Sequence, residues 1–224
     1  MKQITDIFFD LDHTLWDFDK NSELTFDTIF KSHKVDIPLN QFLEVYLPVN
    51  LKYWKLFREG KIEQKNLRYQ RLSEVFQSLQ YKATDDLINN LSSAYIEYLP
   101  NFNHLFPDAF EVLEYLSQKY QLHIITNGFY EVQHKKLGNS KLTPYFKTIT
   151  TSDDAGVKKP NQIIFEYALD LAKTHSHKSL MIGDSLEADV QGAKASGFEA
   201  IFFGQDSNYD GLQIQRLNEL KTLL

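Results

Sequence analysis

The sequence predicts an α/β fold in which a doubly wound parallel sheet carries an inserted helical cap. After Pro100, strand-like and helix-like segments alternate regularly, a pattern typical of a parallel sheet covered by helices on both faces. A further β-rich segment, residues 4–9, lies far upstream of this region. Between the two, residues 21–99 show apolar residues at helical spacing and no clear strand. We therefore assign residues 1–18 and 100–224 to a core and residues 19–99 to a helical cap domain.

The spacing of apolar residues and the positions of prolines predict the individual helices and strands. We expect about four helices in the cap, with Pro48 ending or kinking one of them. In the core, Pro107 suits the start of a helix over residues 108–119. The remaining core helices are expected at residues 129–137, 161–173 and 186–196. The strands are expected at residues 4–9, 121–126, 146–150, 179–182 and 200–203.

Composition narrows the class of protein. The 224-residue chain is 42% hydrophobic, enough to bury a full core. Its net charge of −6 and its lack of long Lys and Arg runs argue against a nucleic-acid polymer as partner. There is no cysteine, which excludes disulfides and thiol catalysis. The apolar segment before Asp10 is too short for a signal peptide or membrane span. We expect a cytoplasmic protein that does not bind membranes and is a monomer or weak homodimer.

Four short polar motifs fall at the ends of four predicted strands, where open α/β sheets bind ligands. They are Asp10-Leu11-Asp12-His13-Thr14, Thr126-Asn127-Gly128, Lys159-Pro160, and Gly183-Asp184 followed by Asp189. Two carboxylates in different environments, such as Asp10 and Asp12, can divide the roles of nucleophile and proton carrier. Taken alone, the same pair is also an ordinary acidic turn after a strand. The coincidence of the four motifs favours a catalytic site.

The other motifs supply complementary groups. The Thr126 hydroxyl and the amides after it could bind phosphoryl oxygens, and Lys159 could face a developing anion, with Lys158 as a competing candidate. Asp184 offers hard carboxylate oxygens without His or Cys nearby, which suits Mg²⁺ better than a transition metal. Asp189 is either a supporting residue of this site or a favourable charge in the first turn of a helix.

In this order, the motifs resemble those of the haloacid dehalogenase superfamily of phosphohydrolases, which have a Rossmann-like core and an inserted cap. Residues 124–129, 156–161 and 183–189 are similar to a pyrimidine 5′-nucleotidase subfamily. The resemblance implies that Asp10 forms an aspartyl-phosphate and that Asp12 acts as acid and base. It also implies phosphoryl binding by Thr126, Asn127 and Lys159. Mg²⁺ would bind Asp10, the Asp12 carbonyl and Asp184, with Thr14 and Asp189 in support. His13 stands where many members have glycine.

The expected function is Mg²⁺-dependent hydrolysis of small phosphomonoesters, with a nucleoside monophosphate as the leading substrate. Open alternatives are a sugar-phosphate or other metabolite phosphatase, a phosphomutase, and a non-catalytic regulatory module on the same scaffold. A nicotinamide-linked oxidoreductase is disfavoured because no Gly-rich dinucleotide motif follows the first strand. Aromatic residues such as Trp16, Phe18, Tyr53 and Trp54 could stack on a nucleobase, although such residues more often belong to a core.

Overall fold

One parallel sheet organises the core. The computed structural model describes residues 4–224; residues 1–3, which we assigned to the core, lie outside the described residues. Within residues 4–224, six strands pair in the order β3-β2-β1-β4-β5-β6, and every neighbouring pair is parallel. Their bounds are β1 Asp6–Phe9, β2 Gln121–Thr126, β3 Phe146–Thr151, β4 Ser179–Gly183, β5 Glu199–Phe203 and β6 Gln213–Ile214. The predicted α/β class and parallel sheet are confirmed.

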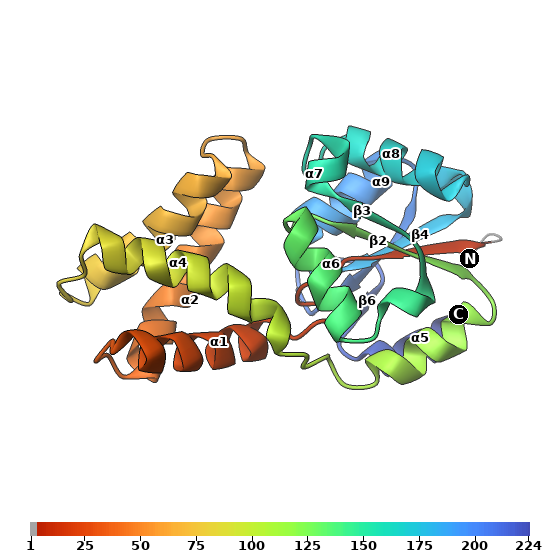
Figure 1. Cartoon of the computed structure of the whole chain (residues 1–224). Helices are drawn as coiled ribbons and strands as arrows, with labels where there is room; N and C mark the ends of the chain where they lie inside the picture. Colours follow the sequence, from red (N-terminus) through yellow and green to blue (C-terminus); the bar gives the residue numbers. More distant parts are fainter. Residues whose placement is uncertain (1–3) are drawn as a thin grey trace. The chain divides into compact units, whose positions relative to one another are not determined.

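Helices cover both faces of this sheet, with α8 and α9 over one face and α5 over the other (Figure 1). The helices are α5 Ala109–Ser117, α6 Tyr130–Asn139, α7 Ser152–Ala155, α8 Gln162–Ala172, α9 Gly192–Ala195 and α10 Leu220–Leu223. The apolar face of α8, including Phe165 and Ala168, packs with Phe8 of β1 and Met181 of β4 in one buried cluster. This burial holds the strands at fixed register, so the residues after β1, β2 and β4 keep fixed positions.

A second compact unit interrupts the chain after β1. One unit comprises the described residues up to Phe18 together with Asn103–Leu224, and the other is Asp19–Phe102. The inserted region contains the helices α1 Phe18–His33, α2 Leu39–Arg58, α3 Gln64–Ser78 and α4 Asp85–Tyr98. Aromatic side chains fill its interior, with the Phe26 ring 4.7 Å from Phe42 and 4.6 Å from Tyr46 between centroids. Our sequence boundary at 99/100 lies a few residues before the division at 102/103.

Several local expectations were wrong. Of the two effects expected of Pro48, ending the helix is excluded, because α2 runs from Leu39 to Arg58 with Pro48 inside it on its exposed side. Helix α5 starts at Ala109, one residue later than predicted, since Asp108 takes a left-handed conformation with φ of 65°. The segment after β4 begins as a π-helical turn, η4 Leu186–Gln191. Strand β6 was not predicted, because two residues carry no periodicity.

Candidate active site

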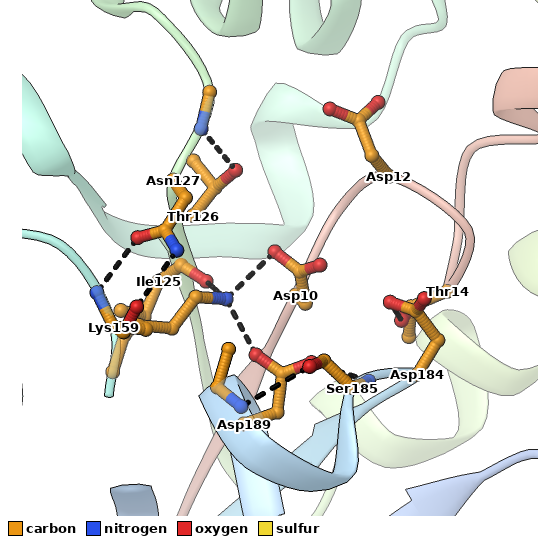
Figure 2. A network of polar contacts seen from close by, with 12 residues as sticks. Asp10, Asp12, Thr14, Ile125, Thr126, Asn127, Lys159, Asp184, Ser185 and Asp189 are labelled. Atoms are coloured by element: carbon orange, nitrogen blue, oxygen red, sulfur yellow. Dashed lines mark hydrogen bonds and ion pairs between the residues drawn. The ribbon is translucent and has the colours of Figure 1, made fainter. Parts of the chain in front are cut away.

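Asp10 lies at the carboxyl end of the central strand β1, between the ends of β2 and β4. Its backbone N–H donates to the carbonyl of Ile182 at 2.9 Å, which continues the β1–β4 pairing up to this residue. Its side chain is 13% exposed, and Oδ1 lies 2.9 Å from the Lys159 ammonium. The central strand of the sheet thus delivers one nearly buried carboxylate to a cation from a different loop (Figure 2).

Lys159 is the buried cation of the site. Its Nζ donates to the Ile125 carbonyl at 2.6 Å and pairs with Asp189 Oδ1 at 2.7 Å. Burial by itself would lower the pKa of Lys159, but the Asp10 and Asp189 carboxylates raise it above the ordinary lysine value, so the side chain is charged. The neighbouring Lys158 is only half-buried. Of the two lysine candidates, Lys159 is therefore the one in the carboxylate cluster.

Asn127 holds the backbone of that lysine. Its Nδ2 donates to the Lys159 carbonyl at 3.1 Å, and its Oδ1 accepts from the Lys159 N–H at 2.8 Å. The peptide bond between Lys159 and Pro160 is cis, and Asn161 after it caps α8. Asn127, whose backbone amide was predicted to bind phosphate, thus uses its side chain to fix the loop that carries the ammonium.

Three carboxylates gather beside Lys159. One oxygen each of Asp10, Asp184 and Asp189 lie within 4.8 Å of one another. Burial raises the pKa of Asp10 to about 7 against the opposing effect of Lys159, and burial followed by the charges of Asp189 and Asp10 raises the pKa of Asp184 well above its usual value. Because one lysine faces three acids, the cluster has an excess of negative charge that a hard divalent cation would balance. These residues fit a Mg²⁺ site.

The turn after β4 explains how Asp189 reaches the cluster. Asp189 is 1% exposed, and its Oδ2 accepts from the Ser185 N–H at 2.9 Å. A Cβ added to Gly183 would lie 2.3 Å from that same oxygen, so only glycine leaves room for the carboxylate. The sequence interpretation of Asp189 as an ordinary helix-start charge does not hold, since the side chain is buried against Lys159.

Thr14 and Thr126 lie at the margins of the cluster. The buried Thr14 hydroxyl donates to Asp184 Oδ1 over a long 3.4 Å. Thr126 is 1% exposed, and its Oγ1 accepts from the Gly128 N–H at 3.1 Å and from Gln133 Nε2 at 2.7 Å. The structure brings both residues to the site that the sequence predicted for them.

Asp12 lies apart from the Lys159 network (Figure 2) and is held by α6. Its Oδ1 is 2.6 Å from Lys136 Nζ, and its Oδ2 accepts from Gln133 Nε2 at 3.0 Å. Burial lowers the pKa of Lys136, against the opposing effect of Asp12. Sequence reasoning missed both α6 residues. The available signal was two polar residues three positions apart on the same helix face as Val132 and Leu137, the face expected to be buried.

His13 takes a left-handed conformation with φ of 59°, which explains why glycine suits this position. Its ring lies 4.9 Å from that of Phe18. Of the aromatic candidates for base stacking, Trp16, Phe18 and Tyr53 are all at least nine-tenths buried. These three belong to the interior in this structure, in line with the more conservative interpretation of them.

Known proteins resemble the chain over its whole length. The profile of the haloacid dehalogenase-like hydrolase family matches residues 7–203. The HAD-hydrolase YfnB of Bacillus subtilis is 30% identical over 224 residues, covering 100% of this chain and 94% of the relative. Its crystal structure, bound to magnesium, matches with a TM-score of 0.90 over 100% of this chain and 99% of that one.

Two further relatives carry the name pyrimidine 5′-nucleotidase. PynA of Streptococcus pneumoniae is 31% identical over 88% of this chain and 82% of its own length. YjjG of Escherichia coli is 31% identical over 85% of this chain and 82% of its own length.

The chain belongs to the haloacid dehalogenase-like hydrolase family. It is an enzyme of the phosphoric monoester hydrolase class, as the motifs predicted. Among residues 4–224, no helix combines the length and apolar character needed to cross a membrane.

Proposed function

We propose that the protein is a Mg²⁺-dependent phosphatase that acts through an aspartyl-phosphate on Asp10. The observation that carries the proposal is the buried Asp10 carboxylate, 2.9 Å from Lys159 and within 4.8 Å of the Asp184 and Asp189 oxygens. A phosphate dianion repels a carboxylate nucleophile, so the site needs positive charge beside it. Asp10, Asp184 and the Asp12 carbonyl would hold Mg²⁺, with Asp189 in support, and the ion would supply charge neutralisation for the phosphoryl group.

The chain's own residues account for each bond change. A carboxylate oxygen of Asp10 forms a bond to phosphorus as the bond to the leaving oxygen breaks, and Asp12 gives that oxygen its proton. Water then attacks the phosphorus of the aspartyl-phosphate, Asp12 takes the proton from that water, and inorganic phosphate leaves with Asp10 restored. Lys159 stabilises the negative charge on the phosphoryl group, and the buried Thr126 hydroxyl supports its binding.

The experiment compares Mg²⁺-dependent hydrolysis of p-nitrophenyl phosphate by wild type and Asp10→Asn. Wild type no faster than Asp10→Asn would favour the non-catalytic regulatory module and end the enzyme proposal. A phosphomutase would transfer its phosphoryl group to a sugar acceptor, whereas release of inorganic phosphate without an acceptor supports hydrolysis.

For the substrate, we propose a nucleoside monophosphate, most specifically a pyrimidine 5′-monophosphate. The similarity to two proteins named pyrimidine 5′-nucleotidase, each 31% identical, supports this choice. A phosphate-release screen with uridine 5′-monophosphate, thymidine 5′-monophosphate and glucose 6-phosphate tests it. If the pyrimidine nucleotides are no better than the hexose phosphate, the nucleotidase proposal fails while the phosphatase proposal stands.

We also propose that the inserted unit, Asp19–Phe102, acts as the cap domain and carries determinants of specificity. Its place in the chain, directly after the loop with Asp10 and Asp12, supports this role, because an inserted lid can exclude water until the covalent intermediate has formed. Exchange of this segment with that of a relative of different substrate preference should transfer the preference without changing the requirement for Asp10.

A further inference from the structure

Two side chains of α6 hold the carboxylate of Asp12 by both of its oxygens. We propose that Lys136 and Gln133 are positioning residues that aim Asp12 for proton transfer; this inference rests on the proposed function. The distances are 2.6 Å from Lys136 Nζ to Oδ1 and 3.0 Å from Gln133 Nε2 to Oδ2. A carboxylate offers about four acceptor sites, so each oxygen keeps one for substrate or water. The contacts fix the rotation of the carboxylate and leave it able to exchange a proton.

Lys136 is itself held in one position. Its side chain is 2% exposed, and its ammonium lies 4.2 Å from the Trp16 ring centroid and 5.3 Å from that of Phe18. Trp16 belongs to the same loop as Asp12 and forms a β-bridge with it. A lysine in solvent samples many rotamers, but this one is confined by aromatic rings and by an ion pair. It can therefore hold the loop and the carboxylate together.

Gln133 links Asp12 to Thr126, the residue that we propose binds the phosphoryl group. The same Nε2 that donates to Asp12 also donates to Thr126 Oγ1 at 2.7 Å. The Gln133 side chain can occupy this position because residue 128 is glycine; a Cβ at residue 128 would lie 2.3 Å from Gln133 Cδ. Gly128, which sequence alone interprets as a turn residue, leaves room for a side chain that ties proton transfer to phosphoryl binding.

Proton transfer to the leaving oxygen matters more for a basic leaving group than for a weakly basic one. Phenol has a pKa of about 10, like the tyrosine side chain, and its oxygen leaves poorly without a proton. p-Nitrophenolate is far less basic and leaves well unassisted. The constant kcat/KM reports only the steps up to the departure of the leaving group, because this departure precedes the attack of water on the aspartyl-phosphate. The ratio of kcat/KM for phenyl phosphate to that for p-nitrophenyl phosphate therefore reports on Asp12 as an acid.

The test measures this ratio with Mg²⁺ for wild type, Lys136→Met and Gln133→Met. Acid catalysis contributes roughly 10²- to 10⁴-fold, so loss of one of two holding groups should lower kcat/KM for phenyl phosphate by about tenfold or more. The value for p-nitrophenyl phosphate should change by only about threefold. Lys135→Met, an exposed lysine on the same helix, is the matched control and should leave the ratio unchanged. If Lys136→Met folds poorly, Gln133→Met carries the same test.

A double-mutant cycle separates positioning from a general structural effect. If Lys136 acts through Asp12, then Lys136→Met should not change the ratio further in an Asp12→Asn background. Equal losses on the two substrates, an unchanged ratio, or a full effect of Lys136→Met without the Asp12 carboxyl would each overturn the proposal. Wild type that hydrolyses neither ester with Mg²⁺ would instead overturn the proposed function, and this inference with it.

Discussion

Removing the ammonium of Lys159 should destabilise the fold strongly when no divalent cation is present. In the variant Lys159→Met, the Asp10 and Asp189 carboxylates lose the cation that lies 2.9 and 2.7 Å away. Breaking a buried ion pair by removing one partner costs about 3–5 kcal/mol, because the remaining charge is uncompensated. For a chain of this size, 1 kcal/mol shifts Tm by about 2–4 °C, so the expected loss in EDTA is about 6–20 °C.

This loss should depend on pH and on metal in a defined direction. The pKa of Asp10, about 7, lies above the 3.8 of a free aspartate, so stability contributed by this group falls as pH rises through 7. Without Lys159 the pKa of Asp10 rises further, and the gap between variant and wild type should widen from pH 6.5 to pH 8.

Thermal unfolding with EDTA or MgCl₂ at both pH values measures these effects. Mg²⁺ should raise the Tm of the variant more than that of wild type, since it replaces part of the lost positive charge. The matched control is Lys158→Met, the adjacent and half-buried lysine, which should change Tm far less. Equal Tm values for Lys159→Met and wild type in EDTA at pH 8 would show that this lysine does not balance the buried carboxylates.

Three other changes have defined outcomes. Asp12→Asn should lower turnover by about 10²- to 10⁴-fold yet keep Mg²⁺ affinity by calorimetry, because the backbone carbonyl remains; equal loss of both would contradict the division of roles. Gly183→Ala should weaken Mg²⁺ binding and lower the free energy of unfolding, measured with urea, by about 1–3 kcal/mol, since the new Cβ would lie 2.3 Å from Asp189 Oδ2. The control Gly138→Ala, where a Cβ meets nothing within 4 Å, should change neither quantity. Burial lowers the pKa of His123, so below about pH 6.5 the unfolded chain binds a proton more readily than the folded one and stability falls. His123→Asn should therefore flatten the decline of Tm between pH 7.5 and pH 5.

Local pattern was enough to predict most of the core. The segment 121–126 was expected as a strand and is β2, because a run of apolar residues bounded by turn signals defines a buried strand without help from the rest of the chain. Elements that depend on packing were less predictable. β6 is two residues long and pairs with β5, and the π-helical turn η4 carries the buried Asp189.

The pattern of apolar runs along the chain is enough to identify the residues that end the strands, and parallel strands place their carboxyl ends at one edge of the sheet. Asp10, Thr126 and Asp184 could be assigned to one site on that ground alone. The pairing of these acids with cations could be seen only once the distant segments were packed together. Asp189 proved to be buried against Lys159, and Asp12 to be held by Lys136, a residue 124 positions later in the chain. Such contacts depend on which face of α6 packs toward the β1 loop, and periodicity along one helix cannot identify its polar partner in another segment.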